Sequence, residues 1–139
     1  MKVIVAMLVS TVVFGAALAQ TAADAKRDAA VEQRIMELHA QLKITPNEEA
    51  QWAQVAVTMR ENARELDQVI DKRDATVTSA SATDNLYSYA DIAQAHANGV
   101  RKLAGAFSGL YAVMSDPQKK LADVVFNHRD HEAGRVASR

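Results

Sequence analysis

The chain has 139 residues, with 16 Lys and Arg against 17 Asp and Glu and no Cys, and this length predicts one domain with a modest core. The formal net charge of −1 argues against a nucleic-acid-binding domain, because a phosphate-binding surface normally carries an excess of Lys and Arg. The absence of Cys excludes a disulfide framework, a thiolate nucleophile, Cys-ligated zinc and iron–sulfur clusters.

Residues 1–19 have the features of a secretory signal peptide. One Lys precedes an apolar stretch over residues 3–14, and Ala-Leu-Ala at residues 17–19 fits the small-x-small rule for cleavage. The apolar stretch is shorter than the roughly 20 residues that span a bilayer, which disfavours the alternative of an uncleaved membrane anchor. We therefore expect cleavage after Ala19, a mature chain that starts at Gln20, and export to a Gram-negative periplasm.

From residue 31 onward, apolar residues recur at alternating steps of three and four, the spacing that lines one face of a helix. Residues 20–30 precede most of this pattern and are expected to form a flexible N-terminal segment. Helices are predicted over about residues 28–43 and 46–73. Their apolar seams are Val31, Ile35, Leu38 and Leu42 in the first helix and Trp52, Ala56, Met59, Ala63, Leu66 and Ile70 in the second.

The third predicted helix, residues 84–113, keeps its pattern over four heptads, which favours left-handed, coiled-coil-like packing. A loop is expected at residues 74–83, a shorter fourth helix at residues 116–127 and a frayed C-terminal tail at residues 128–139. The seams are Leu86, Tyr89, Ala93, His96, Val100, Leu103, Phe107 and Leu110 in the third helix and Leu121, Val124 and Val125 in the fourth.

These patterns predict an all-α domain of four helices over residues 31–127. The third helix also carries a second apolar stripe, which consists of Ala90, Ala97, Ala104 and Tyr111. A helix that is apolar on two flanks needs two partners, one of which could be another subunit. We therefore expect an elongated protein with two long antiparallel helices, and a dimer is one way to cover the second stripe. Gly105 and Gly109 indicate either a close crossing by another helix or drift on a long helix.

Two helix starts carry the same capping sequence. Residues 45–48, Thr-Pro-Asn-Glu, place a hydroxyl at the N-cap, Pro at the first helical position and Glu three residues after the cap. Residues 115–118, Ser-Asp-Pro-Gln, repeat this arrangement. In each, we expect the cap side chain to accept a hydrogen bond from a backbone N–H while Glu48 or Gln118 reaches back to the cap residue.

With the preceding apolar residue included, these segments resemble the paired L-T-x-x-Q motifs of the Spy/CpxP-like periplasmic family. The motif and helix-capping residues are Ile44, Thr45, Glu48, Met114, Ser115 and Gln118. The first copy has Ile for Leu and Glu for Gln, and the second has Met for Leu and Ser for Thr. Each exchange keeps an apolar residue, a hydroxyl cap or a side chain that can bond back to the cap. The resemblance covers residues 31–126.

The resemblance implies a four-helix, cradle-shaped homodimer that binds unfolded or partly folded envelope proteins without ATP. The family also includes stress-response regulators that act on a sensor kinase, and zinc-responsive members. The chain has no nucleotide-binding signature, which agrees with a mechanism that uses no ATP, and we expect no cofactor. No Ser, His and acidic residue share a recognisable catalytic signature, so we expect the protein not to be an enzyme.

A chaperone of this kind needs a surface that is apolar enough to hold a client and charged enough to stay soluble. On the second helix, Met59 and Leu66 lie near Arg60 and Arg64 and could form such a client-binding surface. The competing interpretation is that Met59 and Leu66 belong to the core while the two arginines form a solvated face.

The histidines give a weaker argument for a metal site. His39 and His96 are isolated, and His96 falls in a predicted seam, where a hydrogen-bonded core imidazole is the expectation. His128 and His131 could bind zinc together with neighbouring carboxylates, but their spacing follows no defined zinc motif and a solvated tail is the competing interpretation. Two alternative functions remain: a zinc-binding or metal-responsive accessory protein, and a dedicated adaptor of a sensor-kinase periplasmic domain.

Overall fold

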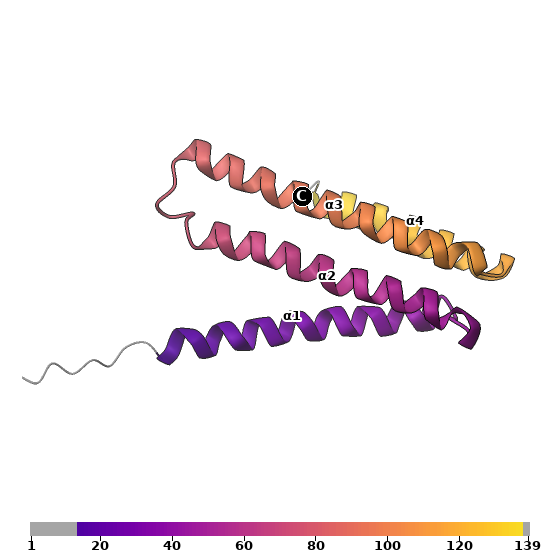
Figure 1. Cartoon of the computed structure of the whole chain (residues 1–139). Coiled ribbons are helices and arrows are strands. Elements are labelled where there is room, and N and C mark those ends of the chain that lie inside the picture. The colour runs from indigo at the N-terminus through magenta and orange to yellow at the C-terminus, as the bar shows by residue number, and fades with distance from the viewer. Residues whose placement is uncertain (1–13, 138–139) are drawn as a thin grey trace, which may run out of the picture.

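The structure, a computed structural model, describes residues 14–137 and, among these, the side chains of residues 22–127. Within this part of the chain four helices follow one another without any strand, so the predicted all-α fold is confirmed (Figure 1). The helices are α1 (Phe14–Gln41), α2 (Glu49–Asp74), α3 (Ala82–Val113) and α4 (Asp116–Ala137), and a 3-10 turn, Pro46–Glu48, precedes α2.

The helix boundaries differ from the predicted ones mainly at the two ends of the chain. α1 includes residues 20–30, for which the sequence predicts a flexible segment, and α4 continues past the predicted end at Asn127 to Ala137. Both extensions are rich in Ala and charged residues, which favour helix without supplying an apolar seam that a periodicity search would detect. Residues 1–13, the greater part of the expected signal peptide, lie outside the described residues.

The helices form an elongated arrangement (Figure 1). α2 and α3 make a long antiparallel hairpin, as predicted, and α1 packs along α2. The α1–α2 and α3–α4 connections lie together at one end of the molecule, and the α2–α3 turn lies at the other. At 1.5 Å per residue, the 32 residues of α3 extend over about 48 Å.

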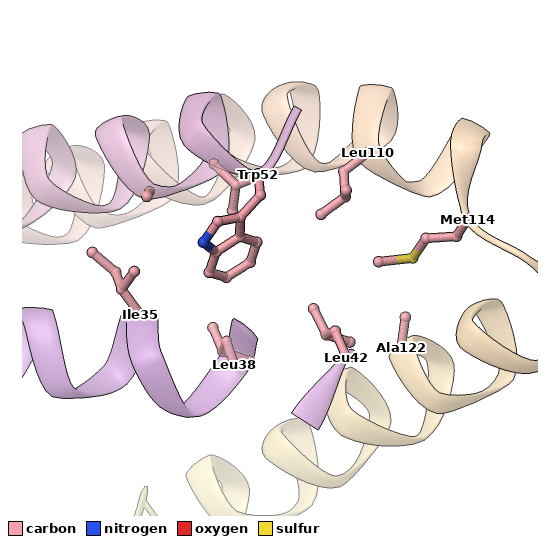
Figure 2. Packing of buried hydrophobic residues seen from close by; sticks show 9 residues of the cluster. Ile35, Leu38, Leu42, Trp52, Leu110, Met114 and Ala122 are labelled. Carbon is pink, nitrogen blue, oxygen red and sulfur yellow. The ribbon is translucent and has the colours of Figure 1, made fainter. Parts of the chain in front are cut away.

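The core lies near the end where the two connections meet. Figure 2 shows Trp52 of α2 and Leu110 of α3 directed toward Leu38 and Leu42 of α1. The buried cluster consists of Ile35, Leu38, Leu42, Trp52, Val55, Ala56, Leu110, Met114 and Ala122. The predicted seam of α1 is therefore confirmed, with Val31 partly buried at its edge.

The packed face of α3 differs from the predicted seam in its N-terminal half. Leu103, Phe107 and Leu110 lie in or against the core, but Leu86 is 72% exposed and Tyr89 is 63% exposed. The less exposed positions between residues 85 and 99 are Asn85, Ser88, Ile92, Ala95, Ala97 and Gly99. Most of these side chains are small, so they allow the α2 backbone to approach closely, whereas the predicted seam includes the larger Leu86 and Tyr89.

In the other two helices the seams are partly confirmed. Trp52 and Ala56 of α2 are buried, and the rest of that seam is half-buried. In α4, Val124 of the predicted seam is exposed and Ala122 takes the buried position instead. α4 is joined to α3 by the edge-on stacking of Phe126 on Phe107, with ring centroids 4.9 Å apart.

Candidate functional site

The apolar residue of the first motif, Ile44, completes a tight turn at the end of α1. Lys43 has a φ of 53°, in the left-handed region that residues with a side chain rarely adopt. The N–H groups of Lys43 and Ile44 donate to the carbonyls of Ala40 and His39, each at 3.2 Å. This is the pattern of a Schellman motif, in which the residue after the left-handed one makes an apolar contact. Ile44 packs against the core cluster and supplies that contact.

Thr45 and Glu48 form the start of the 3-10 turn that leads into α2. Thr45 is the N-cap in extended conformation, and the carboxylate of Glu48 accepts a hydrogen bond from the Thr45 N–H at 2.8 Å. Glu48 thus reaches back to the cap residue, as the capping sequence predicts. Its side chain is only 5% exposed, an uncommon environment for a carboxylate.

The second motif makes a modified version of the same cap. Met114 is buried in the core, and Oε1 of Gln118 accepts hydrogen bonds from the Ser115 N–H at 3.0 Å and the Ser115 hydroxyl at 2.8 Å. The hydroxyl therefore donates to Gln118, whereas the sequence predicts that it accepts from a backbone N–H. The cause is that Gln118 turns its acceptor oxygen toward Ser115 and its amide N–H groups away.

The amide nitrogen of Gln118 joins the two motifs. Its Nε2 donates to the Glu48 carboxylate at 2.9 Å and to the Lys43 carbonyl at 3.1 Å, with a longer contact of 3.4 Å to the Leu42 carbonyl. The last carbonyls of a helix lack intrahelical partners, and a buried carbonyl without a partner is costly. One side chain from α4 therefore caps the end of α1 and binds the residue that starts α2. We call Thr45, Glu48, Ser115 and Gln118 the motif junction.

Glu48 brings a titratable group into the motif junction. Burial alone would raise the pKa of its carboxyl, but hydrogen bonds from the Thr45 N–H, the Gln118 amide and the Thr45 hydroxyl favour the charged form. Together these bonds lower the pKa of Glu48 below its ordinary value. The L-T-x-x-Q pattern has a neutral Gln at this position, so Glu48 makes the junction sensitive to pH in this chain.

The four residues predicted to bind clients do not form one free surface. Met59 packs against the core, and Leu66 is half-buried. Arg60 is held by Glu32 of α1 through hydrogen bonds of 2.5 and 2.8 Å. Arg64 is exposed. Met59 and Leu66 therefore pack inward, and Arg60 is held in an ion pair between helices. Of the four predicted residues, this leaves Arg64 as the charged side chain available to a client.

The histidines are dispersed. Nε2 of His39 lies 2.8 Å from the Glu49 carboxylate, and its ring packs edge-on against Trp52. His96 is exposed, so the expected core imidazole is wrong, because α3 turns a neighbouring face toward α2. Among the residues whose side chains are described, no three His, Asp or Glu gather as metal ligands. The side chains of His128 and His131 lie outside this set.

Sequence reasoning missed a close approach of α2 and α3 at Gly99. Asn62 donates from Nδ2 to the Gly99 carbonyl at 2.7 Å, and a Cβ on Gly99 would lie 3.1 Å from the Asn62 Cγ. By contrast, a Cβ on Gly105 or Gly109 would meet nothing within 4 Å in the described chain. The available signal was a third glycine on α3, but spacing alone does not show which glycine faces a neighbouring helix.

Comparisons with known proteins find a match to one family model. No curated protein and no solved structure matches the chain. No helix in the described residues is long and apolar enough to cross a membrane. The model of the LTXXQ motif family matches residues 30–125, which include both halves of the junction, the whole of α2 and α3, and the parts of α1 and α4 next to them. The chain therefore belongs to the LTXXQ motif family.

Proposed function

We propose that this protein is a periplasmic, ATP-independent chaperone of the envelope stress response, which binds unfolded or partly folded envelope proteins and limits their aggregation. Its membership of the LTXXQ motif family and its resemblance to the Spy/CpxP-like proteins support this function. In this proposal the protein acts by binding, without catalysis and without a cofactor.

The observation that carries the proposal is an exposed apolar patch on the N-terminal half of α3, which consists of Leu86 and Tyr89, one turn apart on the same face. These side chains are 72 and 63% exposed, and Tyr87, on another face of the helix, is 71% exposed. Asp84 and Asp91 flank the patch along the helix. Grouped exposed apolar side chains with a polar rim are typical of interaction sites. Unfolded chains display the apolar side chains that such a patch can hold.

Charged residues on the neighbouring α2 are the second part of the proposed client surface. Arg64 is exposed, and Arg60 lies one turn before it on the helix, paired with Glu32. Positive charge on a binding protein accelerates encounters with acidic clients more than it strengthens the final complex. Met59 and Leu66 complete the proposed set on this helix.

Aggregation assays test the proposal directly. Chemically unfolded model clients are diluted into buffer with substoichiometric to equimolar protein, Gln20–Arg139, and light scattering is followed without ATP or metal. We expect suppression with two unrelated clients. If neither client is protected, the chaperone proposal fails, and a dedicated partner or a zinc-dependent role becomes the hypothesis to test.

Paired variants locate the client surface. We expect Leu86→Ser with Tyr89→Ser to weaken suppression several-fold, because both side chains are exposed and their loss leaves the core intact. Val57→Ser with Val124→Ser is the matched control, since both valines are exposed elsewhere on the molecule. Equal loss in the two double variants would remove the α3 patch from the proposal.

A charge exchange tests the arginines. Arg64→Glu should slow client capture, as should Glu32→Arg combined with Arg60→Glu, which moves the positive charge to α1 while keeping an ion pair. Stopped-flow fluorescence of a labelled client measures the capture rate. Unchanged rates at low salt would exclude these charges from the client surface.

We also propose a homodimer, because part of the second apolar stripe of α3 is uncovered. Ala90 and Ala104 are exposed in the described chain, and small side chains allow another helix to approach closely. Sedimentation velocity measures the assembly state. A monomer at all accessible concentrations would contradict this part of the proposal.

A further inference from the structure

A groove lined mainly by apolar side chains runs along α3. Its first part has a volume of about 360 Å³ and lies between α3 and the α1–α2 pair, against Met59 and Leu66. Its second part has a volume of about 590 Å³ and lies between α3 and α4, against Phe107 and Phe126. Val100 and Leu103 line both parts, so the two adjoin. The client patch around Leu86 is not part of this groove.

The first part of the groove has a cation on its wall and no carboxylate among the described residues that line it. Arg34 of α1 provides the cation, and its buried Nε has no hydrogen-bond partner within the described chain. The contact of its guanidinium with Glu37, at 3.4 Å, uses Nη1 instead. Oδ1 of Asn62, on the same wall, is also buried without a partner. This end therefore has unpartnered polar atoms beside the Arg34–Glu37 ion pair, of which Arg34 lines the groove and Glu37 does not.

The shape and chemistry of the groove restrict its occupant. An extended polypeptide carries an N–H and a C=O at every residue, and those that face the apolar wall would find no partner there. A helix does not fit into the first part, since one turn of a cylinder 10 Å across and 5.4 Å high occupies about 420 Å³, more than the 360 Å³ available there. An unbranched alkyl chain has no polar group along its length. With one anionic group at its end, it matches both the apolar wall and Arg34.

We propose that this groove binds monomeric medium-chain fatty acids, with the carboxylate on Arg34 and the alkyl chain along α3 toward Phe107 and Phe126. The guanidinium provides the charge-assisted hydrogen bonds that a carboxylate accepts. The alkyl chain covers Val100, which is 53% exposed without an occupant. This site shares Met59 and Leu66 with the client set proposed on α2, but its ligand is not a protein, so titration with a fatty acid tests it separately from client protection.

Calorimetric titration of the purified protein with octanoate, decanoate and laurate tests the apolar part. Full burial of each added pair of methylenes corresponds to about a 15-fold gain in affinity, and we expect a several-fold gain per pair in this open groove. Methyl laurate keeps the chain and removes the charge, so we expect it to bind at least several-fold more weakly than laurate. Affinity that does not change with chain length would overturn the proposal.

Matched variants place the ligand in the groove. Val100→Asp should abolish laurate binding, whereas Val113→Asp, at an exposed valine of the same helix outside the groove, should leave it unchanged. Arg34→Gln should remove the preference for laurate over its methyl ester, and Arg101→Gln should preserve it. Circular dichroism confirms that each variant is folded.

The same variants identify other occupants. If laurate does not bind and Val100→Asp dissociates a dimer in sedimentation velocity, a second copy of the chain covers the groove and the fatty-acid proposal is wrong. If Val100→Asp abolishes client protection while laurate never binds, the groove belongs to the client surface, and the proposal is again overturned.

Discussion

Gln118 and Glu48 show how two side chains can join three helix ends. Gln118 lies at the start of α4, yet it donates to carbonyls at the end of α1 and to Glu48 before α2. Spacing within each motif was sufficient to predict that each side chain reaches back to its own cap residue. The bond between them could not be predicted, because it joins residues 70 positions apart and depends on how the helices pack.

Glu48→Gln tests the electrostatics of the motif junction. The folded-state pKa of Glu48 is lowered, so the carboxylate stabilises the fold above its unfolded pKa of about 4.3 and this contribution is lost as the pH falls through the folded pKa. Gln can accept the same hydrogen bonds without titrating. We therefore expect the free energy of unfolding, measured in urea, to decrease less between pH 7 and pH 3 in Glu48→Gln than in the wild type.

The control for this prediction is Glu61→Gln, which changes an exposed carboxylate on α2 outside the junction. Its acid-induced loss of stability should parallel that of the wild type. If Glu48→Gln also parallels the wild type, the buried carboxylate contributes nothing specific to acid sensitivity.

At the scale of helices, periodicity predicted their existence and order better than the faces they bury. The regular apolar spacing of α3 indicated one long helix, and it is one. The same spacing selected Leu86 and Tyr89 for the interior, although both are exposed. The face of α3 that meets α2 depends on how closely the two backbones can approach, and Gly99 permits a close approach. Apolar periodicity did not identify this face, because glycine contributes little to a hydrophobic pattern.

Replacement of glycine by alanine should have opposite effects at different positions of α3. Gly105→Ala and Gly109→Ala should each stabilise the protein by about 0.5–1 kcal/mol, because Ala favours helix and a Cβ meets no neighbour there. Gly99→Ala should destabilise it, since the new Cβ presses on Asn62 and disturbs a hydrogen bond worth about 1 kcal/mol. Urea unfolding midpoints measure all three. A stabilised Gly99→Ala would show that α2 and α3 separate easily at this crossing.

For the whole molecule, the buried core is concentrated at one end. The buried cluster and the motif junction lie near the paired connections, while the α2–α3 turn extends away from them (Figure 1). Regions with little buried apolar surface open at lower free energy than the core. The uneven core leaves apolar groups such as Tyr89 exposed toward the far end of the hairpin.

Hydrogen exchange should report this gradient. We expect amides near Leu38, Trp52 and Leu110 to exchange slowest, and amides in residues 66–74 and 82–92 to exchange at least tenfold faster. Mass spectrometry of peptides from both ends of the hairpin measures these exchange rates. Uniform protection along α2 and α3 would mean that the hairpin unfolds only with the core, or that a partner covers it.

The sequence by itself determined the helical class, the order of the helices, the buried seam of α1 and the two capping motifs. These features depend on residues a few positions apart, which a helix places on one face or in one turn. Only the tertiary structure decided that Gln118 binds Glu48, that Gly99 faces Asn62, and that Arg34 lies on the wall of an apolar groove. Those relations depend on the rotation and separation of whole helices, which close packing of many distant side chains sets together.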